Sequence, residues 1–152
     1  MTRNNARMIA VKLLYSTAFA QSDTDVLLND FFSDEHYSTL AEEDEVFALK
    51  PQKAQMNYIS GIVSLTRKHL GEIDGIISKY SQGRRIERIS GTALAVLRCA
   101  LCEILYFEDI PVSVSINEAV EIAKLYDDSD TVSFINGILG SAARELNNVN
   151  DN

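Results

Sequence analysis

The stretch Ser133-Phe134-Ile135-Asn136-Gly137-Ile138-Leu139-Gly140 decides between a β-hairpin and a helix. An Asn-Gly pair between apolar residues is the strongest short hairpin signal, but the flanking runs should then alternate between apolar and polar residues. Here the apolar residues instead keep a spacing of three to four straight through the pair, at Phe134, Ile135, Ile138, Leu139 and Ala142. This spacing predicts a helix, in which each glycine costs about 1 kcal/mol relative to alanine. We therefore expect a packing or contact reason for the glycines.

The same spacing recurs along the rest of the chain, and no long run alternates with period two. The Ser115-x-x-Glu118 spacing is typical of a capping box, so we expect a helix to open there, and Ser129 or Asp130 can cap the last one. The predicted helices cover residues 3–20, 25–32, 53–69, 70–80, 92–106, 115–126 and a final segment from about 130. The fold class is therefore all-α, a compact bundle of about seven helices.

Length and composition predict a single domain over residues 1–152. A chain of 152 residues with 46% hydrophobic residues can bury roughly two thirds of its unfolded surface. The acidic segment 33–50, which Pro51 ends, is expected to be a mobile connection with Phe47 and Leu49 tucked onto the core.

The sequence also limits location and chemistry. No apolar run approaches the roughly 18 residues that span a bilayer, and the start MTRNNARM lacks the apolar centre of a secretory signal, so we expect a cytoplasmic protein with no membrane partner. Cys99 and Cys102 form a C-x-x-C inside an apolar helical run, which favours buried packing and no metal. No nucleophile and base pair or phosphate-cradling loop is apparent, so no enzyme and no cofactor are predicted.

The net charge of −8 is unevenly distributed. Residues 1–22 carry three bases and no acid, and residues 51–98 carry eight bases against three acids, so a basic surface can persist on this acidic protein. Arg3 and Arg7 lie one helical turn apart and could meet phosphates together, although two solvated arginines at a helix start explain the same pattern.

Other arginines have simpler explanations. Arg84, Arg85 and Arg88 form a basic connection, for which a solvated loop is the simplest interpretation. Arg98 lies in a helix that is apolar nearly all round, and a buried arginine there is expected to be paired structurally.

Three segments together resemble the NusB family of bacterial transcription antitermination factors. They are ARMIAVKLLYS from Ala6, AVLRCALCEILYF from Ala95, and SVSINEAVEIAKLYDDSDTVSFINGILGSAARELN from Ser113. The last resembles the family's I-N-E-A-x-E-x-A-K followed by F-x-N-G-x-L. The resemblance implies an all-helical RNA-binding adaptor without catalytic activity. Such an adaptor joins NusE, the ribosomal small-subunit protein, and with it holds boxA RNA of nascent ribosomal RNA transcripts in the transcription elongation complex.

The resemblance also implies site residues. The family's arginine-rich start corresponds to residues 3–7, where Asn4 and Asn5 replace two basic residues and imply weaker, less salt-sensitive RNA binding. The implied RNA-binding residues are Arg3, Arg7, Tyr15 and Phe134, and those implied for NusE are Tyr15 and Asp130. Phe134 could stack on an unpaired base or belong to the core.

Two other functions are compatible with the sequence. One is an acidic protein-interaction adaptor with weak RNA affinity, which a flat salt dependence of RNA binding would indicate. The other is a detached NusB-like domain of an RNA methyltransferase, although the chain lacks a glycine-rich cofactor loop and a catalytic cysteine context. A monomer or weak homodimer is expected.

Overall fold

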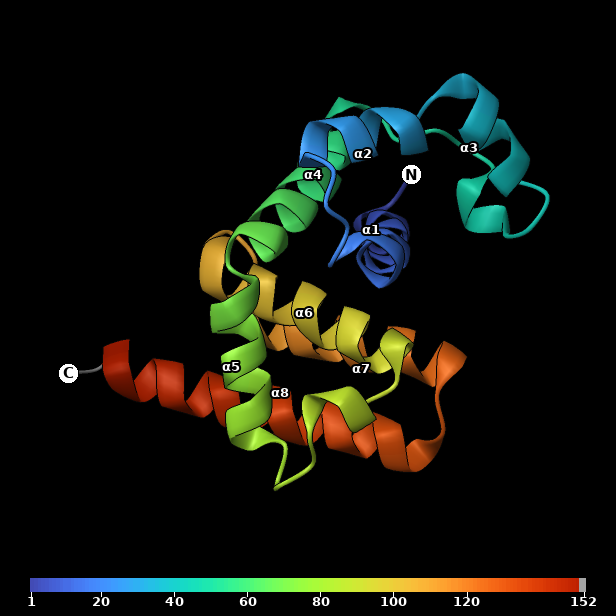
Figure 1. Ribbon diagram of the computed structural model, residues 1–152. Helices are drawn as coiled ribbons and strands as arrows, with labels where there is room; N and C mark the ends of the chain where they lie inside the picture. The colour runs from blue at the N-terminus through green and yellow to red at the C-terminus, as the bar shows by residue number, and fades with distance from the viewer. Residues whose placement is uncertain (151–152) are drawn as a thin grey trace. The chain divides into compact units, whose positions relative to one another are not determined.

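The computed structural model describes residues 1–150, with side chains through residue 146, and every regular element in that range is helical (Figure 1). Two short 3₁₀ helices, η1 (Glu45–Phe47) and η2 (Ile86–Arg88), accompany the α-helices. The α-helices are α1 (Arg3–Thr17), α2 (Thr24–Phe31), α3 (Asp34–Leu40), α4 (Lys53–Lys68), α5 (Leu70–Tyr80), α6 (Gly91–Tyr106), α7 (Val112–Tyr126) and α8 (Ser129–Asn150). The predicted all-α class is confirmed, with α3 as the helix that the periodicity did not show.

The chain divides into two compact units, Met1–Lys68 and His69–Asn152. The first contains α1 to α4 and the second contains α5 to α8. A single NusB-like domain over residues 1–152 stays a prediction. None of the helices in the described range is both long and apolar enough to cross a membrane.

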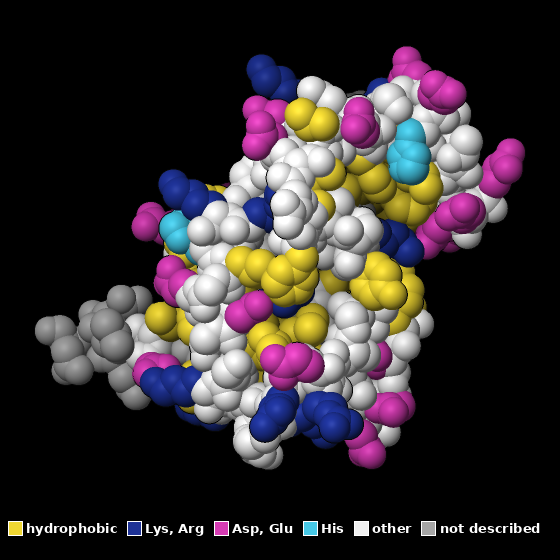
Figure 2. Space-filling model, viewed as in Figure 1, with side chains coloured by type: hydrophobic (Ala, Val, Ile, Leu, Met, Phe, Trp, Pro, Cys, Tyr) yellow, Lys and Arg dark blue, Asp and Glu magenta, His cyan; other side chains and the backbone are white. Residues whose placement is uncertain are grey.

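In the first unit α1 packs against α4, while α2, α3 and η1 gather around an aromatic cluster. The cluster consists of Phe31, Phe32, Tyr37 and Phe47, with ring centroids 4.9 to 6.3 Å apart. Acidic side chains surround α2 and α3 on the outside, as Figure 2 shows in magenta. Burial of the rings therefore gives this acidic stretch a local core.

This cluster corrects the expectation for residues 33–50. The segment was predicted as a connection, but it contains α3 and η1. Phe47 is buried as predicted, whereas Leu49 is 66% exposed, and its carbonyl instead accepts a hydrogen bond from the Tyr37 hydroxyl at 2.9 Å. The aromatic side chains that order the segment are too widely spaced in the sequence to form a helical stripe.

In the second unit α6 packs against α5, α7 and α8. Its circumference is buried almost throughout from Ala93 to Glu103, as a helix that is apolar nearly all round requires. Arg98 donates from Nε and Nη2 to the two carboxylate oxygens of Asp74 on α5, both at 2.9 Å, which confirms the predicted structural pairing. Cys99 and Cys102 are buried and form no disulfide, as predicted for packing residues.

The start of α7 differs from the predicted capping box. The helix begins at Val112, directly after Pro111, and Ser115 already lies inside it. The Ser115 hydroxyl donates to Glu103 Oε1 at 3.0 Å, and both residues are buried. A buried carboxylate needs hydrogen-bond donors, so this contact from α6 determines the role of Ser115.

The stretch Ser133–Gly140 is helical and lies in α8, as predicted from its spacing. Ile135, Ile138 and Leu139 face the core. The cap is Asp128 and not Ser129 or Asp130, because Asp128 Oδ1 accepts from the Thr131 backbone N–H at 2.8 Å. This hydrogen bond is the main cause of the lowered pKa of Asp128.

Candidate nucleic-acid interface

The first candidate surface lies at the start of α1. Thr2 caps the helix, its hydroxyl oxygen accepting from the Asn5 N–H at 3.1 Å, so the chain turns into a helix just before Arg3. The first turn contains no acidic residue, although a helix N-terminus favours negative charge. Arg3 in this turn adds positive charge to the helix end, which favours the approach of an anion.

The two predicted arginines occupy different environments. Arg3 is exposed, and its guanidinium carbon lies 4.7 Å from the ring centre of Tyr58 on α4. Arg7 is only 4% exposed, lies 6.0 Å from the same ring, and donates from Nη1 to Asn4 Oδ1 at 3.0 Å. Tyr58 therefore brings both arginines together, but only Arg3 reaches the surface fully.

Tyr15, further along α1, is 63% exposed. An exposed aromatic side chain of this size is available to a base or to a protein partner. Its predicted contacts with RNA and NusE stay predictions.

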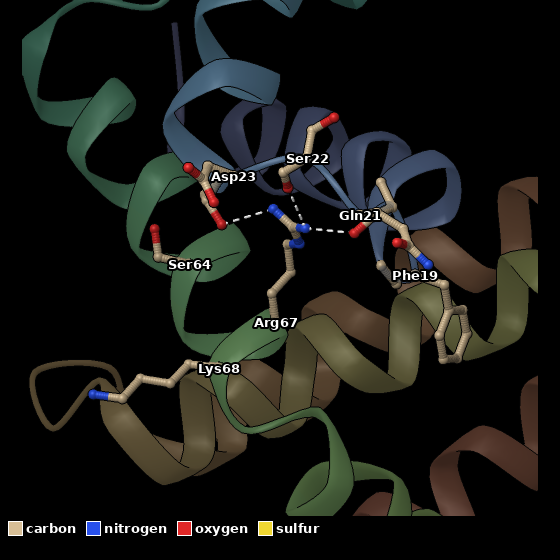
Figure 3. A pocket seen from close by; sticks show the side chains of 10 residues that line it. Phe19, Gln21, Ser22, Asp23, Ser64, Arg67 and Lys68 are labelled. Carbon is tan, nitrogen blue, oxygen red and sulfur yellow. Dashed lines mark hydrogen bonds between the residues drawn. The ribbon is translucent and has the colours of Figure 1, made fainter.

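The end of α1 borders a hollow of about 570 Å³ (Figure 3). Arg67 of α4 points into it and donates to the carbonyls of Ala20 and Ser22 and to the hydroxyl of Thr24. With these bonds the guanidinium ties the α1–α2 loop to α4, so we interpret Arg67 as a structural clamp and not as an anion site.

The second candidate surface is a pocket of about 450 Å³ in the second unit, which contains both predicted α8 residues. Phe134 is half-buried, and the guanidinium carbon of Arg84 lies 4.4 Å from its ring centre. Asp130, one helical turn before Phe134, is exposed at the same pocket. The other lining residues are Tyr80, Gln82, Ser133, Gly137, Ile138, Ser141 and Arg144.

Two features at or beside this pocket were not predicted from the sequence. Arg84 was assigned to a solvated loop, because nothing local relates it to Phe134. Basic side chains do gather at the α5–α6 connection, dark blue at the lower edge of Figure 2. Gly137 also opens onto this pocket, and a Cβ there would meet nothing within 4 Å, so no neighbouring backbone explains the glycine.

The predicted site residues thus fall into two groups, with Arg3, Arg7 and Tyr15 in the first unit and Asp130 and Phe134 in the second. Within the described residues, no group of three or more His, Cys, Asp or Glu side chains is arranged to hold a metal ion. The fold and these two surfaces define a small all-helical protein whose exposed cation and aromatic pocket suit an anionic, base-bearing ligand.

Comparison with known proteins assigns the family. Residues 4–144 match the NusB family. The chain is 38% identical over 149 residues to the transcription antitermination protein NusB of Natranaerobius thermophilus, covering 97% of this chain and 98% of that protein. It is 40% identical over 144 residues to the NusB protein of Ruminiclostridium cellulolyticum, covering 95% and 90%. The chain therefore belongs to the NusB family.

Solved structures agree with this assignment. The fold is similar to that of T. maritima NusB, with a TM-score of 0.70 and 31% identity over 95% of this chain and 92% of that one. It is also similar to a chain in a crystal structure of antitermination factors NusB and NusE in complex with double-stranded RNA. There the TM-score is 0.72 with 22% identity over 94% and 96% of the chains, which supports the fold alone.

Proposed function

We propose that this protein is a transcription antitermination factor that binds boxA-type RNA together with NusE and so promotes processive transcription of ribosomal RNA operons. The observation that carries the proposal is the family match over residues 4–144, which includes nearly all of α1 and the first four turns of α8. The relatives that match over almost their whole length are transcription antitermination proteins, and one similar structure contains NusE and RNA.

The physical roles follow from the two surfaces. Arg3 contacts phosphates from the start of α1, and the Phe134 ring stacks on a base beside Arg84. Tyr15 and Asp130 contact NusE, and Arg7 supports the first patch from its buried position. In this proposal the protein acts by binding, catalyses no reaction and works in the cytoplasm as a monomer or weak homodimer.

Titration of labelled boxA RNA tests this function. The RNA is titrated with the protein alone, with NusE alone and with both, and we expect the pair to bind more tightly than either protein does. A scrambled RNA of equal length is the control. If NusE adds nothing to the affinity for boxA, the proposed function is wrong.

Variants at the partner surface refine the test. Tyr15→Ala and Asp130→Ala should each weaken capture of NusE, because both residues present exposed side chains for a partner. Phe19→Ala is the matched control for Tyr15→Ala, since Phe19 is another exposed aromatic residue just beyond α1. Equal losses in all three variants would point to a general effect of surface aromatics or charge.

The alternative function, a protein-binding adaptor with weak RNA affinity, is favoured by the burial of Arg7 and its engagement with Asn4. Salt dependence separates the two functions. The affinity for RNA falls as salt rises, and each phosphate contact to single-stranded RNA makes the slope of log affinity against log salt more negative by about 0.7. An RNA affinity that does not change with salt would favour the adaptor. A slope that corresponds to one phosphate contact or more would favour the RNA-binding function.

A further inference from the structure

One face of α4 contacts the start of the chain through two residues three positions apart. Tyr58 lies beneath the guanidinium of Arg3, whose central carbon is 4.7 Å from the ring centre. Gln55 Nε2 donates to the backbone carbonyl of Met1 at 3.0 Å. Residues three apart share a helix face, so α4 holds both the backbone and a side chain of the segment that opens α1.

Tyr58 and Arg3 differ in exposure, as expected if a buried ring holds an exposed side chain in place. The tyrosine is 3% exposed and is held in the core, whereas Arg3 is exposed. A guanidinium over an aromatic ring is attracted to the ring's electron-rich face. This contact leaves N–H donors of the guanidinium for the bidentate contact that phosphate favours.

An unsupported arginine side chain loses rotamer freedom when it binds, and this loss weakens the complex. Contact with a fixed ring removes part of that loss before binding. Arg7 does not duplicate this arrangement, because it is buried, lies farther from the ring and donates to Asn4. The Tyr58 ring therefore positions Arg3 more than Arg7.

We propose that Tyr58 is a positioning residue for RNA binding, whose ring holds the Arg3 guanidinium ready to receive a phosphate. This inference rests on the proposed function. It adds a residue of α4 that contacts no RNA itself and acts through Arg3.

The test measures the affinity of fluorescein-labelled boxA RNA by fluorescence anisotropy at constant low salt, with NusE present. Tyr58→Phe keeps the ring and should leave the affinity unchanged. Tyr58→Leu removes the ring face and should weaken binding about three- to tenfold. In an Arg3→Ala background, the same Tyr58→Leu change should weaken binding by less than about twofold, since the group it positions is gone.

Tyr37→Leu is the matched control, because Tyr37 is another buried tyrosine of the first unit and belongs to the α2–α3 cluster. It should lower thermal stability as Tyr58→Leu does, yet leave RNA affinity unchanged. If Tyr37→Leu weakens RNA binding as much, or if Tyr58→Leu acts equally with and without Arg3, the loss is a folding effect and the positioning role is overturned.

Failure of the inference can be distinguished from failure of the proposed function. If the unmodified protein binds boxA RNA with NusE but Tyr58→Leu binds equally well, only the positioning role is overturned. If the unmodified protein with NusE shows no affinity for boxA RNA, the proposed function fails and this inference fails with it.

Discussion

The guanidinium carbon of Arg84 lies 4.4 Å from the centre of the Phe134 ring, so a cation from the α5–α6 connection covers an aromatic side chain of α8. Phe134 is half-buried and lines a pocket of about 450 Å³. A cation over an aromatic face stabilises the ring's position and places positive charge where a nucleic acid would bring a base and its phosphate.

Phe134→Ala should therefore weaken RNA binding. Loss of one stacking platform costs about 1–3 kcal/mol in such complexes, which is roughly a 5- to 150-fold loss of affinity. Arg84→Ala should cause a smaller loss of RNA affinity, because it leaves the ring in place. It should also make the affinity depend less steeply on salt, because it removes a positive charge. Fluorescence anisotropy with boxA RNA and NusE measures both effects.

The control for this pair is Leu125→Ala, which removes a 64% exposed apolar side chain from α7 in the same unit. It should leave the affinity for RNA unchanged. If Phe134→Ala lowers only the thermal stability and not the RNA affinity, Phe134 is a packing residue and has no part in binding.

The ion pair between the buried Arg98 and the half-buried Asp74 should contribute to the stability of the second unit. Both carboxylate oxygens are engaged, and the Arg98 side chain is 6% exposed. Asp74→Ala removes the carboxylate that both guanidinium nitrogens contact and should lower the free energy of unfolding by about 3–5 kcal/mol. Urea denaturation measures the loss.

A surface pair provides the comparison. Lys124 and Glu121 form an exposed ion pair at 3.0 Å on α7, and Glu121→Ala should change the free energy of unfolding by no more than about 0.5 kcal/mol. Similar losses at both sites would mean that the Asp74 contact contributes no more than a surface pair.

Two glycines of the second unit should respond to alanine with opposite signs. Gly137 is helical and an added Cβ meets nothing within 4 Å, so Gly137→Ala should raise the free energy of unfolding by about 1 kcal/mol. Gly83 has a φ of +83°, a conformation that residues with a side chain disfavour, so Gly83→Ala should lower the free energy of unfolding by about 1 kcal/mol. Thermal unfolding of both variants checks the signs, and a destabilised Gly137→Ala would contradict the open environment.

The second unit should lose stability at high pH through Tyr106. Burial, followed by the hydrogen bond that its hydroxyl donates to Glu72 at 3.0 Å, raises the pKa of Tyr106 from 10.0 to about 12. The folded state therefore favours the neutral phenol more than the unfolded state does. This contribution is fully present below about pH 10 and is lost as the pH rises towards about 12.

Tyr106→Phe should remove this dependence, so its urea midpoint should fall less than that of the unmodified protein between about pH 10 and 12. Tyr15→Phe serves as the control because that phenol is exposed. Parallel pH profiles for the unmodified protein and Tyr106→Phe would contradict the role of Tyr106.

Several features could be predicted from local patterns. The helical spacing through Asn136 and Gly137 was sufficient to exclude a hairpin, and α5 begins and ends at the predicted residues. The lone Arg98 in an apolar helix indicated a buried partner, although not which one. These inferences succeed because a helix brings residues three and four apart together whatever the rest of the chain does.

Other features failed because they depend on distant partners. Ser115 was predicted to open α7, but it lies inside the helix and donates to Glu103 of α6. The acidic segment was predicted as a connection, but Phe31 and Tyr37 meet Phe47 there and order it. In each case the contact that determines the structure joins residues of different elements, and helical spacing in the sequence does not reveal such contacts.

The sequence by itself determined the helical class, most helix boundaries and the family, because periodicity and motifs are properties of neighbouring residues. Only the tertiary structure decided that the Arg3 guanidinium lies over the Tyr58 ring, that Arg7 is buried, and that the Arg84 guanidinium lies over the Phe134 ring. The physical reason is that the local sequence around an exposed arginine and around a buried one can be the same. Their surroundings are set by which helix faces pack together when apolar surface is removed from water.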